Sequence, residues 1–275
     1  MRDLGPLAEM VEAHDPVRFS SALLAPAERR RGLLALLALN VELARISAMA
    51  HEAMIAEIRL AWWREALAGL AQGHTRGHPV LSELLMLVEA GTIQGAELES
   101  LASARQFDIS TDTMADEAAF ADYAHDGAGG LARLSIRHLG AELPDDFVQT
   151  AARAGLRINH LTGLWGNLAR GKVFLGAAPI LPVADAAAIL AERPPHNQAR
   201  DWFADQIARA DNELNQVKAA WRREWRGALP AFASLRLSRK VLAQIRRDPF
   251  RVHPQPGPGA RARMVVMAAL TGRPL

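Results

Sequence analysis

The stretch from residue 26 to residue 67 constrains the fold of this chain more than any other. Pro26 suits the first position of a helix, and Glu28 places a negative charge at the positive end of the helix dipole. Five of the seven residues from Leu33 to Leu39 are leucine, so two turns of the helix are apolar on nearly every side. Such a helix is usually buried inside a larger helical body. A second, amphipathic helix is predicted at residues 55–67.

Composition favours the same fold class. Half of the 275 residues are hydrophobic, which is enough for a sizeable core in one large domain or two small ones. Alanine and leucine are abundant and β-branched residues are sparse, which favours helix over strand. The absence of cysteine excludes a disulfide scaffold and any thiolate site.

Membrane spans and leader peptides are not predicted. The longest apolar run is Leu33–Leu39, far shorter than the roughly 20 residues that a membrane span needs. The first fifteen residues contain acids and no apolar core typical of a signal peptide. We expect a cytoplasmic protein, with a peripheral position at the inner membrane face as the alternative.

Charge is distributed unevenly along the chain. Residues 217–275 contain thirteen lysines and arginines but only two acids, Glu224 and Asp248, whereas the whole chain has a net charge of +2. This basic end favours an anionic partner, although a solvated basic face explains it equally well. Trp221 and Trp225, one helical turn apart among arginines, suit a membrane interface or a helix seam. We expect a protein partner or an anionic membrane at residues 217–263, and no nucleic acid.

Hydrophobic periodicity and capping residues predict about ten helices. Residues 1–25 are expected to form a short helix and a loop, broken at Asp15-Pro16. Several acids lie between Asp108 and Asp122, and helix capping explains them better than a metal site, with Thr111-Asp112 as the expected N-cap. The other predicted helices span residues 79–90, 93–105, 114–124, 145–169, 185–192, 198–226, 235–245 and 261–270.

Two segments resemble the squalene/phytoene synthase family. The first contains Ser-Ser-Ala-Leu-Leu-x-Pro-x-x-Arg-Arg at residues 20–30, Ala-Leu-Leu-Ala-Leu at 35–39 and Arg-Leu-Ala-Trp-Trp-Arg-Glu at 59–65. The second contains Leu161-Thr162 and Gly-Lys-Val-Phe-Leu at 171–175. The resemblance implies an all-α, isoprenoid synthase-like helical bundle that forms a single domain over residues 1–275. It also implies an enzyme that joins two prenyl diphosphates head to head.

The acidic motifs of that family are missing. Its first Asp-x-x-x-Asp motif falls on Ala44 and Ala48, and the first aspartate of its second motif falls on Asn167, beside a deletion. Magnesium binds carboxylate oxygens, whereas alanine offers no ligand and asparagine only a neutral one. No catalytic residue, metal or cofactor is therefore expected. Magnesium is expected only if the chain is an active synthase. The local sequence from Asn40 to Ala44 resembles a divergent branch of the family, the complex I assembly factors.

Other residues remain candidates for lining a cavity. Tyr123, Ala128 and Gly129 match a family segment that lines the prenyl cavity, and we expect them to face the helix of Ala44 across an apolar pocket. Tight packing without a ligand explains the small residues equally well. The remaining polar candidates, of which the basic ones suit an anion or simple solvation, are Asn40, Arg45, Asn159, Arg170 and Lys172.

Three functions follow from these observations. The first is a catalytically degenerate family member that serves as a non-enzymatic assembly or interaction factor, with respiratory complex I as a candidate target. The second is an active, magnesium-dependent prenyl diphosphate synthase with a rearranged site. The third is a binder of lipid or prenyl chains.

Overall fold

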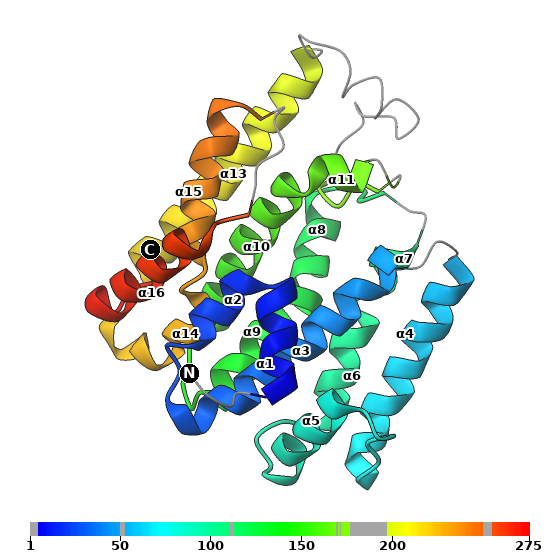
Figure 1. The fold of residues 1–275 in the computed structure, drawn as a ribbon. Coiled ribbons are helices and arrows are strands. Elements are labelled where there is room, and N and C mark those ends of the chain that lie inside the picture. The colour runs from blue at the N-terminus through cyan, green and yellow to red at the C-terminus, as the bar shows by residue number, and fades with distance from the viewer. Residues whose placement is uncertain are drawn as a thin grey trace.

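The computed structural model describes residues 5–49, 53–110, 113–168, 170, 172–176, 197–249 and 255–275. These residues contain helices and no strand, which confirms the predicted fold class (Figure 1). The N-terminal helices are α1 (Gly5–His14), α2 (Pro16–Ala22), α3 (Ala27–Met49), α4 (Ala53–Ala68), the 3₁₀-helix η1 (Gly69–Gln72), α5 (Pro79–Glu89) and α6 (Gly95–Ser103). The later helices are α7 (Gln106–Ile109), α8 (Glu117–Ala124), the π-helix η2 (His125–Gly129), α9 (Gly130–His138), α10 (Asp145–Thr162), α11 (Leu164–Leu168), α13 (Asn197–Ala220), the 3₁₀-helix η4 (Arg223–Ala228), α14 (Leu229–Phe232), α15 (Leu235–Arg247) and α16 (Pro258–Thr271).

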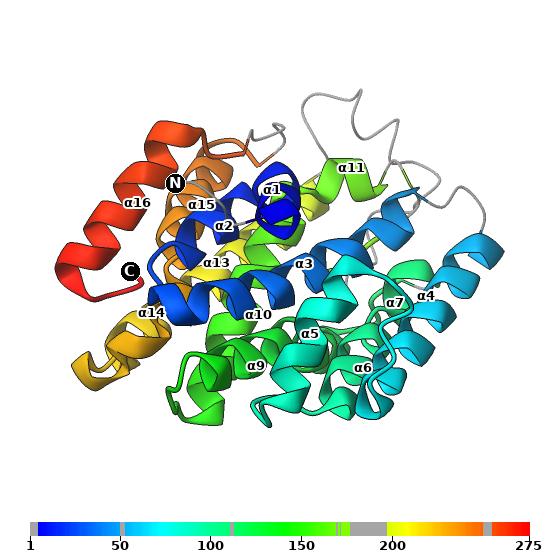
Figure 2. The ribbon, with the colours of Figure 1, turned by 60° about the horizontal axis from the view of Figure 1, so that its bottom comes forward.

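The α8–η2–α9 segment lies in the middle of the bundle. Its backbone stays in the right-handed helical region through both junctions, so the three elements form one interrupted helix. It packs against α3 through α9 and against α10 through α8 and η2. The helices α4 to α6 lie on the side of α3, while α13, α15 and α16 lie on the side of α10 (Figures 1 and 2). This central segment thus lies between α3 and α10.

The core on the α3 side consists mainly of leucine and alanine. Every residue from Leu33 to Leu39 is buried, as the sequence predicts. A glycine permits the close approach of α9 to α3: a Cβ atom on Gly32 would lie 2.4 Å from the ring of His138. Since real Cβ atoms do not come so close to another side chain, this position requires glycine.

The core on the α10 side is rich in aromatic rings. Trp221 is buried, and its indole N–H donates to the carbonyl of Gly272 at 2.9 Å. Trp225 is half-buried, with its ring centroid 5.0 Å from that of Phe147. Of the two roles predicted for these tryptophans, a membrane interface or a helix seam, the structure supports the helix seam, because both rings pack against the interior of the bundle.

Some helix boundaries differ from those expected. Residues 16–22 form a helix because Asp15 caps it by accepting from the Arg18 N–H at 3.0 Å and Pro16 takes the first position. The helix expected at 114–124 begins at Glu117, capped by Asp116. The helix expected at 145–169 ends at Thr162, and the one expected at 198–226 ends at Ala220. Thr111, Asp112 and the helix expected at 185–192 lie outside the described residues.

Candidate functional site

The first motif helix, α3, offers no carboxylate at the motif positions. Ala44 is exposed, and the side chain of Ala48 lies outside the described part of the chain. Arg45 forms an ion pair with Glu42 of its own helix at 3.6 Å. One turn earlier, the Asn40 side-chain oxygen accepts a hydrogen bond from Arg105 at 2.6 Å. The polar side chains at this end of α3 are therefore already bonded within the protein.

Arg105 and its partner Asp108 connect three helices, α3, α7 and α8. The Arg105 guanidinium, which precedes α7, donates to Asn40 of α3 and to an oxygen of Asp108 at 3.1 Å. The other oxygen of Asp108 accepts from the Tyr123 hydroxyl of α8 at 2.7 Å. Both oxygens of this carboxylate are thus engaged, one by a cation and one by a phenol. This part of the structure thus contains an ion pair between Arg105 and Asp108 whose charges cancel.

Aromatic rings occupy the space beside Tyr123. Its ring lies 5.5 Å from that of Phe107 and 6.0 Å from that of Phe174. His160 of α10 stacks on Phe174 with centroids 4.5 Å apart and planes only 9° from parallel. Lys172 donates to the carbonyl of Ser110 at 2.5 Å, with its ammonium 4.3 Å from the centroid of Phe107. The structure therefore joins Asn40, Tyr123 and Lys172 in one polar and aromatic cluster.

Burial sets the protonation states in this cluster. Burial lowers the pKa of His160 to about 3, with a further contribution from the charge of Arg105, so the imidazole is neutral at pH 7. Burial, followed by the negative charge of Asp108, raises the pKa of Tyr123 well above its usual value. Burial opposes the charge on Arg105, yet Asp108 and Tyr123 raise its pKa above the ordinary value. The cluster thus contains a neutral imidazole, a protonated phenol and a guanidinium that stays charged at pH 7.

The second motif segment is more open. Asn159 and Arg170 are exposed, and Arg170 donates to the side-chain oxygen of Asn167 at 2.7 Å. The Asn167 carbonyl accepts from the Lys172 N–H at 2.9 Å, which positions Lys172. Asn167 therefore acts as a turn-forming residue at the end of α11, with its amide oxygen already bonded.

The glycine-rich segment forms the π-helix η2. Gly127 and Gly129 are buried and Ala128 is half-buried, so the segment faces the interior of the bundle as expected. A Cβ atom on Gly129, however, would lie 3.1 Å from the side chain of Gln149 on α10. Gly129 therefore approaches α10, and the expectation that it faces α3 is wrong.

The residues present do not fit a magnesium site. Among the described residues, no three histidine, aspartate or glutamate side chains converge closely enough to bind a metal ion. Among the described acids, Glu42 is paired with Arg45, and Asp108 is paired with Arg105 and Tyr123. Asp122 is exposed. Because magnesium requires several oxygen ligands in octahedral geometry, this arrangement has too few free carboxylates.

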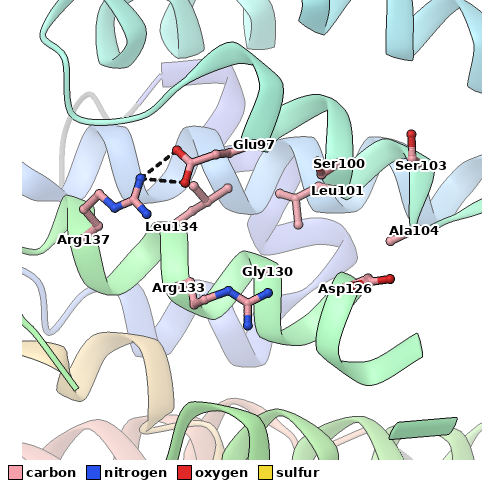
Figure 3. Close-up of a pocket in the computed structure, with 10 residues that line it drawn as sticks. All are labelled: Glu97, Ser100, Leu101, Ser103, Ala104, Asp126, Gly130, Arg133, Leu134 and Arg137. Carbon is pink, nitrogen blue, oxygen red and sulfur yellow. Dashed lines mark hydrogen bonds and ion pairs between the residues drawn. The ribbon is translucent and has the colours of Figure 1, made fainter. Parts of the chain in front are cut away.

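A separate groove lies between α6 and the η2–α9 segment, with a volume of about 510 Å³ (Figure 3). Arg137 donates to both oxygens of Glu97 at 2.7 Å across its mouth. Arg133 lies below Gly130 and bonds to the His125 carbonyl at 3.0 Å. None of the motif positions lines this groove, so it is not the counterpart of the family's cavity.

Sequence reasoning missed Arg105, His160 and Arg157. Arg157 is fully buried on α10 and bonds to Glu117, Glu213 and Gln206. A signal for Arg157 was present, because it lies on the apolar stripe of its helix three residues after Ala154 and four before Leu161. Arg105 and His160 left no such signal.

Comparisons with known proteins agree with this fold. The squalene/phytoene synthase family model matches residues 11–267. A complex I assembly factor 6 from Mus musculus is 24% identical over 249 residues, which cover 90% of this chain and 75% of that protein. The Homo sapiens protein is 23% identical, and the match again covers 90% of this chain and 75% of that protein.

Solved structures of the same fold are also similar. A squalene synthase from Alicyclobacillus acidocaldarius has a TM-score of 0.72 at 16% identity, covering 90% of this chain and 94% of that one. A dehydrosqualene synthase has a TM-score of 0.79 at 14% identity, covering 98% and 96%. This chain therefore belongs to the squalene/phytoene synthase family.

Proposed function

We propose that this chain is a catalytically degenerate family member that acts as an assembly or interaction factor for respiratory complex I. The observation that carries the proposal is the state of the two motif segments. Ala44 supplies no ligand, and the amide oxygen of Asn167 is bonded to Arg170. The half-buried carboxylate of Asp108 is bound by Arg105 and Tyr123.

The physical reason lies in the charge of the substrate. A prenyl diphosphate carries dense negative charge, and its departure as diphosphate requires metal ions that bridge it to the protein. Arg45 and Arg170 are basic but are paired within their own segments. Without clustered carboxylates a magnesium–diphosphate complex would be held only weakly.

The partner is proposed from the relatives. The mouse and human proteins matched over 90% of this chain are named as assembly factors of complex I. An assembly factor contacts protein subunits, so the corresponding partner here is a subunit or an intermediate of such a complex.

The test is deletion of the coding sequence in its host, followed by native gels of NADH dehydrogenase. Restoration of the assembled complex by the wild type and by N167A is expected. Normal assembly without the protein would refute the role.

The alternative is an active synthase, and the overall fold favours it, because the match to a dehydrosqualene synthase covers nearly the whole chain. Incubation with farnesyl or geranylgeranyl diphosphate and magnesium, followed by extraction of hydrocarbons and alcohols, separates the two functions. No product above a heat-killed control is expected. Turnover would establish the synthase, and binding of a prenyl chain without turnover would favour the third function, a lipid binder.

A further inference from the structure

The last helix, α16, exposes a stripe of apolar side chains. Val266 is 55% exposed, Met267 37% and Leu270 76%. Arg263 lies three residues before Val266 and is also exposed, so these four side chains share one helical face. The opposite face contains Met264 and Ala268, both buried against the bundle. The helix thus buries one set of apolar side chains against the bundle and exposes a second set of large apolar side chains to solvent.

The helix is held firmly at its C-terminal end. Trp221 donates to the Gly272 carbonyl, and Arg226 donates to the Ala269 carbonyl at 2.8 Å. Arg236 donates to the Arg273 carbonyl at 2.9 Å. Cations and donors at a helix C-terminus satisfy the last carbonyls and the dipole. The exposed stripe is therefore presented by a fixed element.

The surroundings of the stripe are strongly basic. Residues 255–275 contain no acid, and the neighbouring η4 region exposes Arg222, Arg223 and Arg226 with a single acid, Glu224. The only other group of exposed large apolar side chains among the described residues is on α4, at Met54, Ile55 and Ile58. There an exposed glutamate and an exposed arginine, at positions 57 and 59, balance each other. The basic surroundings therefore distinguish α16 from α4.

The position of α16 suits a broad, flat partner. It is an outermost helix that packs on α2 and α15 and lies along the edge of the bundle (Figures 1 and 2). The groove between α6 and the η2–α9 segment contains no α16 residue in its described lining. A second groove, between α10 and α13, contains none either. None of the described helices is both long and apolar enough to cross a bilayer.

We propose that the α16 face binds an anionic phospholipid bilayer as a peripheral contact. Val266, Met267 and Leu270 enter the interface between headgroups and acyl chains, while Arg263 and the η4 arginines face the lipid phosphates. Apolar burial and attraction to anionic lipids are the two contributions that retain such a helix at a membrane surface. This contact goes beyond the assembly role and does not depend on it.

Vesicle flotation tests the proposal. At low salt the full-length protein is expected to float with phosphatidylcholine vesicles that contain 30% phosphatidylglycerol, and not with phosphatidylcholine alone. The double variants V266S/L270S and R223Q/R263Q should each weaken partitioning by roughly tenfold or more, and 0.5 M salt should release the protein. The matched variant M54S/I58S, on the equally exposed α4 face, should bind like the wild type. Failure of the wild type to float, or equal losses in M54S/I58S and V266S/L270S, would overturn the proposal.

A fluorescent probe tests the orientation. Because the chain has no cysteine, a single A269C variant can be labelled uniquely with an environment-sensitive dye on α16, and A61C provides the same label on α4. Both positions are exposed. Anionic vesicles are expected to shift the emission of the α16 label to the blue and to leave the α4 label unchanged. A shift of the α4 label alone, or of neither label, would contradict the proposed face.

Discussion

Arg157 and Arg105 lie in different parts of the bundle, and their partners differ. Arg157, in the core around α10, is fully buried and bonds to two carboxylates and the amide of Gln206. Arg105, where α3, α7 and α8 meet, bonds to one carboxylate and one amide. In both places the acids near the two motif helices are bound to guanidinium groups. The comparison teaches that, in these two described places, the acidic side chains form ion pairs with arginine. Carboxylates that are paired in this way are not free to bind a metal ion.

The largest effect is expected from removal of the Arg157 charge. In R157M the buried Glu213 loses its main partner, and the free energy of unfolding should fall by about 3–5 kcal/mol. Urea denaturation followed by circular dichroism measures the loss. The matched variant is R153M, because Arg153 lies 3.7 Å from the same carboxylate but is partly exposed, and it should lose less than about 1 kcal/mol. Equal losses would mean that Arg157 is not the central partner.

Disruption of the Arg105 cluster should lower the free energy of unfolding by less than removal of the Arg157 charge does. In D108N the positive charge keeps only neutral partners, and the free energy of unfolding should fall by about 1–3 kcal/mol. Y123F removes one donor from the same carboxylate and should cost about 1 kcal/mol, with coupling between the two changes in a double-mutant cycle. D122N, on the exposed neighbour of Tyr123, is the control and should be neutral. Additive effects of D108N and Y123F would show that the hydrogen bond contributes nothing.

The free energy of unfolding should fall in acid because the buried imidazole of His160 is neutral in the folded protein. Its pKa is about 3 in the folded protein and near 6.5 when unfolded, so the unfolded chain binds more protons between these values. Stability from this group is complete above pH 6.5 and is lost as the pH falls toward 3. From pH 7 to pH 5 the wild type should lose up to about 2 kcal/mol more than H160F, which keeps the stack on Phe174. Parallel pH profiles for the two proteins would contradict a buried neutral imidazole.

Much of the fold was predictable from local patterns. The apolar run from Leu33 to Leu39 fixed one helix as buried, and Pro79 marked the start of another within one residue. The start expected at residue 114 failed because Asp116 caps this helix at Glu117, and several residue types in the preceding stretch are equally good N-cap candidates in the sequence. Trp221 was ambiguous because a core helix and an interfacial helix share the same spacing.

The candidate site was less predictable, because its partners lie far apart in the sequence. Asn40 and Arg105 are separated by 65 residues, and Lys172 and Ser110 by 62. Such pairs arise only when the helices pack, so Asp108 looked like one more acid in a capping run. The motif comparison showed that Ala44 offers no ligand and Asn167 only a neutral one, but it contained nothing about the ion pair between Arg105 and Asp108.

The most direct test of the degenerate site is a calorimetric titration of the protein with farnesyl thiodiphosphate, a slowly ionising diphosphate analogue, with and without magnesium. An active synthase of the family serves as the positive control. Because Ala44 offers no ligand, the Asn167 amide oxygen is bonded to Arg170 and Asp108 is bound to Arg105, no magnesium-dependent binding is expected. Saturable binding of one equivalent that requires magnesium and disappears on chelation would show that other acids have assembled a working site, and would contradict the non-enzymatic function.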